Sequence, residues 1–167
     1  MTGVQTCALP IYSAGGYLIS VKTQNSRAWS VVDLPLSDIE IRVKTEKISG
    51  PEDTNFGIIC RFRNEDNFYS FLISSDGYYG IMKVENGVEA LLGSDQFTYS
   101  EQIKIGSALN QIEATCSGNE LSLSVNGQML QTVKDTSFSA GKVGMIVETR
   151  AEGDAAIVFS DFSVIKH

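Results

Sequence analysis

The sequence has very few of the residues that most catalytic and metal sites need. It contains one histidine, at the last position, and three cysteines among 167 residues. A Ser-His-Asp triad, a Cys-His pair and a multi-histidine metal site therefore cannot be assembled from this chain. A glycine-rich phosphate loop and a Cys-x-x-Cys motif are missing as well, which excludes the site classes that depend on them.

Basic residues and long apolar runs are also scarce. Thirteen Lys and Arg stand against twenty Asp and Glu, and the net charge is −7. No nucleic acid partner is therefore expected, because a phosphate backbone must be neutralised by clustered basic side chains. No apolar run approaches the roughly 20 residues that cross a bilayer, so the sequence predicts no membrane span. A charged segment followed by an apolar one, the pattern of a signal peptide, does not open the chain.

The first eleven residues, 1–11, stand apart from the rest. They show neither strand alternation nor a helical period, and they resemble translated adapter sequence from the end of a metagenomic assembly. We therefore expect a non-native tail at 1–11 and a single domain at 12–167, a fragment of a larger protein whose true start is missing. Cys7 is then left out of the cysteine count, and the lack of a signal peptide says nothing about where the protein resides.

Short apolar alternations separated by turn residues account for nearly all of the remaining chain. The stretch 55–84 reads as three consecutive antiparallel strands, joined by turns at 64–67 and at Asp76-Gly77. The Asp-Gly dipeptide accepts the positive φ of a two-residue hairpin, and the middle strand can then lie inside a larger sheet. Further strands are predicted at 17–21, 28–32 (ending before Pro35), 38–44, 88–92, 111–117, 120–125, 128–133, 142–148 and 155–165, with a surface loop at 93–107.

These strands predict the fold class. No segment reads as a helix of any length, and no internal repeat or linker divides the chain. We therefore predict an all-β fold, a two-sheet antiparallel sandwich of ten or more strands.

The order and spacing of these elements resemble a known superfamily. The motifs that carry the resemblance are Gly16-Tyr17, Gly57-Ile-Ile-Cys-Arg61, Asp66-Asn67-Phe-Tyr69, Asp76-Gly77-Tyr78, Gly118-Asn119, Val125-Asn-Gly127, Gly141-x-Val-Gly144 and Phe159-x-Asp-Phe-x-Val164. With them, the chain resembles the concanavalin A-like jelly-roll superfamily, in particular the laminin-G-like modules of bacterial exported and surface proteins. The resemblance implies a jelly roll and an extracellular or cell-surface location. It implies no single activity, because this fold hosts lectins, glycosidases and structural domains.

Catalytic carboxylates are the feature that would favour an enzyme. Jelly-roll glucanases carry Glu-x-Asp-x-x-Glu, or a version one residue shorter, on one strand, which aims a nucleophile and an acid at one glycosidic bond. The nearest match, Asp38-Ile-Glu40, continues with Arg42 and Val43 where the last carboxylate belongs, so a solvated strand face is the better interpretation. The segment 55–61 resembles a strand of keto-disaccharide hydrolase-like domains. In those domains the adjacent strand carries acidic and amide side chains, whereas here it offers Ser70 and Leu72. No catalytic residue is predicted.

One face of the three-strand unit supplies the predicted ligand site. If the hairpins pair Arg61 with Tyr69 and Ser75 with Tyr78, the ligand-binding residues Arg61, Tyr69, Phe71 and Tyr78 share that face. Sugars pack their C–H surface on aromatic rings and hydrogen-bond polar groups through their hydroxyls. The alternative is that these residues are core, with Arg61 satisfied by backbone carbonyls or a carboxylate. A register change of one residue would also exchange the two faces, both of which are apolar.

Two further features concern cysteine and calcium. With Cys7 set aside, Cys60 and Cys116 form a pair on the apolar faces of their strands, and two buried free thiols are one interpretation. The resemblance to exported modules favours a disulfide between them. Calcium is the one cofactor left open, because Asn64-Glu65-Asp66-Asn67 and Asp135 carry oxygen donors. Asn and Asp are equally expected there as turn formers.

The function that follows is a non-catalytic laminin-G-like or lectin-like module that binds a glycan or a cell-surface ligand. Such a module would be one domain of an exported or surface-anchored bacterial protein. A glycoside hydrolase-like domain of the same fold and a purely structural domain are the two alternatives. A cluster of carboxylates on a sheet face would favour the enzyme, and the predicted strands do not supply one.

Overall fold

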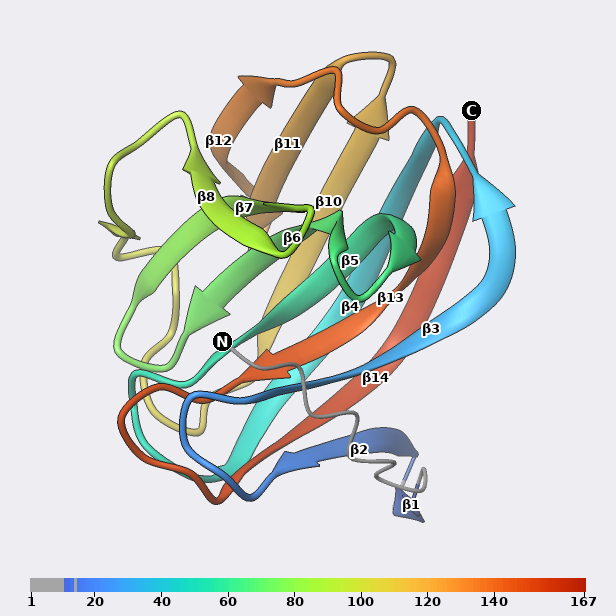
Figure 1. Cartoon of the computed structure of the whole chain (residues 1–167). Helices are drawn as coiled ribbons and strands as arrows, with labels where there is room; N and C mark the ends of the chain where they lie inside the picture. Colours follow the sequence, from blue (N-terminus) through green and yellow to red (C-terminus); the bar gives the residue numbers. More distant parts are fainter. Residues whose placement is uncertain (1–10, 14) are drawn as a thin grey trace.

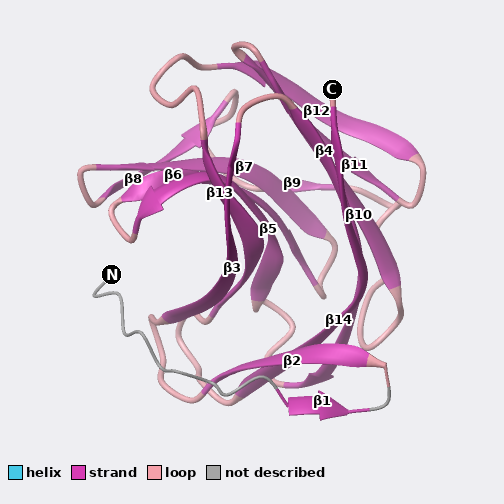
Figure 2. Cartoon of the chain, turned by 90° about the vertical axis from the view of Figure 1, so that its right-hand side faces the viewer, coloured by secondary structure: helices cyan, strands magenta, loops and turns pink. Residues whose placement is uncertain are grey.

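The structure is a computed structural model that describes residues 11–13 and 15–167. Within this part of the chain it contains fourteen β-strands and no helix, arranged as two antiparallel sheets packed face to face (Figures 1 and 2). The predicted all-β sandwich is therefore confirmed. The tail expected at 1–11 lies outside the described residues except for Ile11, where the first strand begins.

The first sheet, sheet A, contains seven strands. In order across the sheet they are β1 (Ile11–Ser13), β2 (Gly16–Val21), β14 (Ala155–Lys166), β4 (Ile39–Ser49), β10 (Asn110–Ser117), β11 (Glu120–Val125) and β12 (Gln128–Lys134). In β4 the alternating residues Ile39, Ile41 and Val43 are buried, while Arg42 between them is exposed. This alternation places one face of the strand against the second sheet and the other in solvent, as the sequence predicted.

The second sheet, sheet B, contains the predicted three-strand unit. In order, its strands are β3 (Arg27–Leu36), β13 (Gly141–Glu148), β5 (Asn55–Asn64), β6 (Asn67–Ser74), β7 (Tyr78–Glu85) and β8 (Val88–Leu92), with the short β9 (Thr98–Tyr99) paired to β7. β6 pairs with β5 and β7, as predicted for the middle strand. β3 continues through Pro35, where an end was predicted, because an edge strand needs no backbone donor on its free side.

A bulge at Arg61 changes the predicted register of the first hairpin. Cys60, not Arg61, pairs with Tyr69, and the register shifts between Cys60 and Asn64. Arg61 has a φ of 51°, in the left-handed region, which bends the strand at the bulge. Gly141 on β13 makes room for this bend, since a Cβ there would lie 2.4 Å from the Arg61 carbonyl carbon.

The second hairpin also differs from the prediction by one residue. β6 pairs Ile73 with Tyr79, so Ser75 does not pair with Tyr78. Because successive side chains of a strand point to opposite faces, Tyr78 lies on the face opposite to Tyr79. Tyr69 and Phe71 therefore point between the sheets, while Tyr78 lies on the outer face of sheet B.

Two apolar clusters lie on the two faces of sheet B. The larger lies between the sheets and includes Ile39, Ile41, Val43, Ile58, Cys60, Tyr69, Phe71, Ile112, Ala114 and Cys116. The smaller lies on the outer face of sheet B and consists of Ile59, Phe62, Phe68, Leu72, Met82, Val84 and Ile146. Both faces of the three-strand unit are therefore apolar, as the sequence indicated.

Sheet B is strongly curled (Figure 2). Its edge strands β3 and β8 lie at opposite ends of the strand order, yet Arg27 Nη1 lies 3.0 Å from Glu89 Oε1. The Arg27 guanidinium also lies 5.1 Å from the centre of the Phe68 ring. An ion pair between opposite edges spans the outer face, and this face is therefore concave.

Candidate functional site

A groove lies on the concave face, beside β7, β8 and the loop that follows β8. One part of the groove has a volume of about 510 Å³ and is lined by Met82, Glu89, Ala90, Leu91, Ser94, Asp95, Gln96, Phe97 and Arg150. The other part has a volume of about 160 Å³ and is lined by Asp53, Asn55, Ser74, Asp76, Tyr78, Phe97 and Arg150. Phe97 and Arg150 line both parts, which are therefore adjacent, and together we call them the outer groove.

Phe97 and Arg150 form the centre of the outer groove. The Arg150 guanidinium lies 5.0 Å from the centre of the Phe97 ring. With the Asn55 amide oriented so that its oxygen faces Arg150, that oxygen accepts hydrogen bonds from Nη2 at 2.8 Å and from Nε at 3.3 Å. Gly80 on β7 lets the ring approach the sheet, since a Cβ there would lie 3.2 Å from Phe97 and 2.8 Å from Leu91. The half-buried ring and the exposed guanidinium are thus held in place by the sheet beneath them.

The charged lining of the outer groove is mainly acidic. Its charged side chains are the guanidinium of Arg150 and the carboxylates of Asp53, Asp76, Glu89 and Asp95. An aromatic ring surrounded by hydrogen-bonding groups suits a ligand that has both an apolar face and many hydroxyl groups. The groove can bind and orient such a ligand.

Glu148, the last residue of β13, is a buried acid next to these groups. Its side chain is 2% exposed, and its Oε1 has no hydrogen-bond partner among the described residues. Burial raises the pKa of Glu148 to about 7, and the neighbouring Glu89 carboxylate acts in the same direction, whereas Arg27 and Arg150 oppose the shift. The folded protein therefore holds a proton on Glu148 at pH values at which an exposed glutamate is ionised.

This proton makes stability depend on pH. Below the ordinary pKa of 4.5, Glu148 is protonated in the folded and unfolded states alike, and between 4.5 and about 7 only the folded state keeps the proton. The free energy of unfolding should therefore fall as pH rises through this window, by up to about 3 kcal/mol, and level off above it. We expect the Glu148→Gln variant to lack this decline when urea unfolding is measured from pH 4.5 to 8. Parallel pH curves for parent and variant would contradict this prediction.

Three of the four predicted ligand-binding residues lie in the protein interior. The exposed fractions are 1% for Arg61 and 0% for Tyr69 and Phe71, whereas Tyr78 is 40% exposed and lines the outer groove. The structure therefore does not bring the four residues together on one open surface. The physical reason is the β6–β7 register, which places Tyr78 on the opposite face of the sheet from Tyr69 and Phe71.

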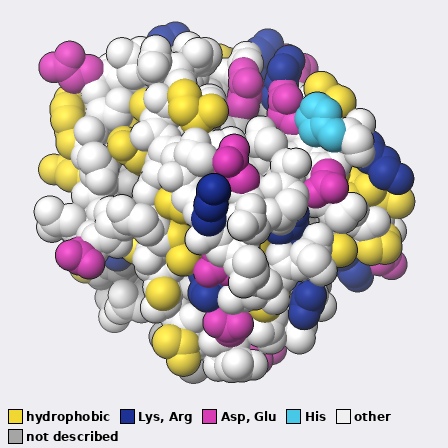
Figure 3. Space-filling view, turned by 90° about the horizontal axis from the view of Figure 1, so that it is seen from above, with side chains coloured by type: hydrophobic (Ala, Val, Ile, Leu, Met, Phe, Trp, Pro, Cys, Tyr) yellow, Lys and Arg dark blue, Asp and Glu magenta, His cyan; other side chains and the backbone are white. Residues whose placement is uncertain are grey.

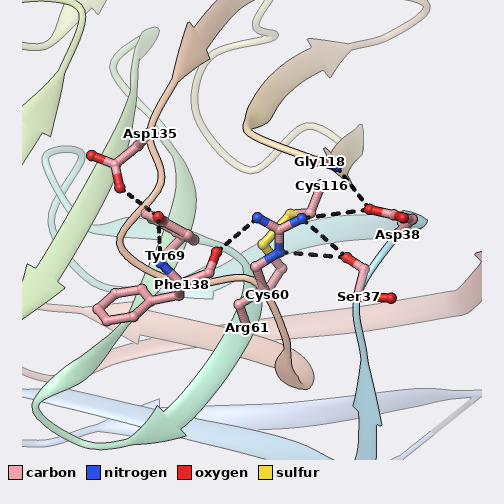
Figure 4. The surroundings of a disulfide bond; sticks show 9 residues. All are labelled: Ser37, Asp38, Cys60, Arg61, Tyr69, Cys116, Gly118, Asp135 and Phe138. Atoms are coloured by element: carbon pink, nitrogen blue, oxygen red, sulfur yellow. Dashed lines mark hydrogen bonds and ion pairs between the residues drawn. A yellow bond between two sulfur atoms is a disulfide. The ribbon is translucent and has the colours of Figure 1, made fainter.

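Arg61 is held by backbone carbonyls and a carboxylate at one end of the sandwich (Figure 4). Its Nη1 donates to the Phe138 carbonyl at 2.8 Å, and its Nη2 donates to the Ser37 carbonyl at 3.2 Å. Asp38 Oδ1 lies 3.7 Å from the same Nη2. Burial lowers the pKa of Arg61, while Tyr69 and Asp38 act against this shift. The guanidinium borders a depression of about 350 Å³, but these partners already use its donors. This arrangement matches the core alternative that the sequence left open.

Tyr69 and Asp135 form a hydrogen-bonded pair near the same end. The Tyr69 hydroxyl donates to Asp135 Oδ1, and Lys83 Nζ lies 3.0 Å from Asp135 Oδ2. Burial and the bond to Asp135 raise the pKa of Tyr69 to about 12. Burial alone would raise the pKa of Asp135, but hydrogen bonds from Tyr69, Ser137 and Lys83 lower it to about 2. Asp135, one of the predicted calcium donors, is therefore occupied by protein groups.

The other predicted calcium donors lie in the 64–67 turn. Asn64 Oδ1 accepts hydrogen bonds from the Asp66 backbone N–H at 3.0 Å and from Asn67 Nδ2 at 2.9 Å. These are the contacts of turn-forming side chains. Across residues 11–13 and 15–167, no group of three or more His, Cys, Asp or Glu side chains could hold a metal ion.

Cys60 and Cys116, the predicted disulfide pair, lie between the two sheets. Their sulfur atoms are bonded at 2.05 Å and connect β5 of sheet B to β10 of sheet A (Figure 4). Both cysteines are fully buried in the larger cluster. The bond therefore joins the sheets directly across the core.

The outer groove uses residues that the sequence interpretation missed. Phe97 lies in the predicted surface loop 93–107, and Arg150 follows the end of β13. An aromatic residue in an otherwise polar loop is a usable signal, because a ring of that size usually packs on something. Arg150 carried no such signal, because its contacts with Phe97 and Asn55 depend on the tertiary structure.

On the face seen from above, charge is not segregated in a way that would suit a polyanion (Figure 3). Figure 3 shows acidic and basic side chains mixed over the face seen from above. Acidic and basic side chains also form ion pairs, for example Lys44 Nζ with Asp161 Oδ2 at 2.6 Å. No helix of the described part of the chain is long and apolar enough to cross a membrane.

Comparison with known proteins shows what the fold is. No protein-family model and no curated protein matches the sequence. The carbohydrate-binding module CBM66 from Bacillus subtilis superposes with a TM-score of 0.67 at 16% identity, covering 91% of this chain and 83% of that chain. Sheep galectin-11, in complex with glycerol, gives a TM-score of 0.59 at 14% identity, with 82% of this chain and 96% of that chain covered.

A GH43 protein from Bacillus licheniformis is also similar, with a TM-score of 0.66 at 14% identity over 91% of this chain. The match covers 33% of that longer chain, so this chain spans about a third of it. At these identities the likeness concerns the fold alone. The two antiparallel sheets share their sandwich fold with these solved structures, which is consistent with a concanavalin A-like jelly roll.

Proposed function

We propose that this domain is a non-catalytic carbohydrate-binding module whose ligand, a glycan free or on a cell surface, binds in the outer groove. The observation that carries the proposal is the Phe97 ring beneath the Arg150 guanidinium, surrounded by hydrogen-bonding side chains in one open groove. A sugar can pack its C–H face against the part of the ring that Arg150 leaves open and place its hydroxyls against the polar groups. The fold shared with CBM66 and galectin-11 supports the proposal.

A glycoside hydrolase-like activity is the second candidate. It is favoured by Glu148 and Glu89, because glycosidases use two carboxyl groups of which one is held protonated, and Glu89 acts on the pKa of the buried Glu148. However, Glu148 is 2% exposed and does not line the groove, and Glu89 is paired with Arg27. These two facts favour binding without catalysis.

We further propose that the protein is a laminin-G-like module of an exported or surface-attached bacterial protein. The buried bond between Cys60 and Cys116 supports export, since disulfides persist in oxidising compartments. Secretion with its natural leader and detection of the domain outside the cell would test this location.

The binding proposal can be tested with a glycan array and two groove variants. We expect the parent to bind at least one glycan, and Phe97→Ala and Arg150→Ala each to weaken that binding at least tenfold with little change in stability. Arg63→Ala is the matched control, because Arg63 is exposed and stacks on Phe138 at 5.1 Å away from the groove. It should bind as the parent does.

Three outcomes would contradict this proposal. A parent that binds no glycan would leave the structural-domain alternative. Glycan binding that survives both groove variants would place the site on another surface. Release of shorter sugars from the bound glycan, lost in Glu148→Gln, would favour the hydrolase.

A further inference from the structure

The outer groove opens onto an exposed pair of tyrosines. Tyr78, which lines the groove, is 40% exposed, and Tyr99 is 54% exposed. Their ring centres lie 5.6 Å apart with the rings at 70°, an edge-to-face pair. The two residues face each other where β9 pairs with β7. Two large aromatic side chains thus stand in solvent directly beside the proposed sugar site.

The β6–β7 turn supports this pair from below. Gly77 has a φ of 94°, and a Cβ at this position would lie 2.7 Å from Tyr99 Cε2 and 3.6 Å from Ile105 Cγ2. Only glycine therefore allows the Tyr99 ring to lie on the turn. Ile105, which is 64% exposed, extends the apolar surface. We call Tyr78, Tyr99 and Ile105 the tyrosine platform.

The platform and the groove are continuous. Tyr78 belongs to both, and the single segment 94–99 carries Phe97 into the groove and Tyr99 onto the platform. An exposed apolar patch that is bordered by polar residues is typical of a binding surface. Exposed aromatic rings beside a sugar site are suited to further sugar rings, each of which has an apolar face.

From this continuity we propose that the ligand is a neutral glycan chain, an oligosaccharide or polysaccharide rather than one terminal sugar. The groove binds one part of the chain, and the tyrosine platform binds the sugars beyond it. This inference rests on the proposed function of the groove and adds the length and charge of its ligand.

The charge of the groove is the reason for a neutral chain. Four carboxylates and one guanidinium line it, and the three platform side chains carry no charge. Glu89 is already paired with Arg27, but a chain of uronic or sulfated sugars would place negative charges beside Asp53, Asp76 and Asp95, and such like-charge contacts are unfavourable. A neutral chain meets no such repulsion.

The test uses neutral oligosaccharides of glucose, xylose, mannose and fructose with two, four and six sugar units, titrated calorimetrically into the parent and variants. For the series that binds, we expect at least tenfold tighter binding of the six-unit than of the two-unit sugar. Tyr99→Ala should remove this gain and leave the two-unit affinity unchanged, while Tyr99→Phe should keep the gain. Phe97→Ala should weaken binding of both lengths. Ile165→Ala, an exposed apolar residue on sheet A, is the matched control and should behave as the parent.

The outcomes separate this inference from the function on which it rests. Equal affinity for two and six units, or a gain that survives in Tyr99→Ala, would overturn the platform while the groove function stands. A uronic acid chain bound as tightly as the neutral series would overturn the neutral assignment. A parent that binds none of these sugars at any length would overturn both.

Discussion

Replacing Cys60 and Cys116 together by alanine is expected to lower the free energy of unfolding by about 4 kcal/mol. The bond joins residues separated by 56 positions. Closing a loop of this length removes chain entropy from the unfolded state, which corresponds to about 4 kcal/mol on the chain-entropy model. The two sulfur atoms are also fully buried in the cluster between the sheets, so their removal adds a loss of packing. Equilibrium unfolding in urea measures the difference, with Cys7→Ser in parent and variant to remove the third thiol.

Two controls separate the bond from the packing of its atoms. A reductant should lower the stability of the parent toward that of the double variant and leave the double variant unchanged. Thiol titration of the unfolded, unreduced parent in the Cys7→Ser background should find no reactive thiol after export to an oxidising compartment. Two reactive thiols would show that Cys60 and Cys116 are free, and the predicted loss would then shrink to the packing contribution alone.

The strands could be predicted from the sequence because burial on one face leaves a period of two. β4 shows this directly, with Ile39, Ile41 and Val43 buried and the residues between them in contact with solvent. The position of the turn at Asp76-Gly77 was readable too, because Gly77 has a positive φ, but the loop spans residues 75–77 and is one residue longer than the predicted two-residue hairpin. Local chemistry of this kind determines elements and their order, and the sandwich follows from it.

The same period of two could not reveal the register near Arg61. A bulge adds a residue to one strand without any change in hydrophobic pattern, and Arg61 is a residue type that seldom has a positive φ. The bulge changed which β5 residue faces Tyr69, and the β6–β7 turn, which differs from the prediction by one residue, placed Tyr78 on the opposite face. The outer groove was out of reach as well, because the curl that brings β3 and β8 into contact through Arg27 and Glu89 is a property of the whole sheet.

Arg61→Met is expected to lower the free energy of unfolding by about 3 kcal/mol. Methionine has no donor, so the carbonyls of Ser37 and Phe138 would lose the partners that they have inside the protein. Leaving buried acceptors unpaired costs on the order of 1 to 3 kcal/mol each, partly offset because a charge no longer has to be buried. Arg61→Lys should also lower the free energy of unfolding, but by less than Arg61→Met does. One ammonium group can replace only part of the hydrogen bonds that the guanidinium fork makes.

The neighbouring residue provides the matched control for Arg61. Arg63 lies on the same strand and is exposed, so Arg63→Met should change the free energy of unfolding by less than about 0.5 kcal/mol. Urea unfolding of the three variants, with glycan binding measured on the folded fraction, then separates the two roles considered for Arg61. A residue of the core loses stability and leaves the affinity of the folded protein unchanged, because the outer groove does not contain Arg61. An Arg61→Met protein that is as stable as the parent but binds no glycan would instead restore Arg61 to the ligand site.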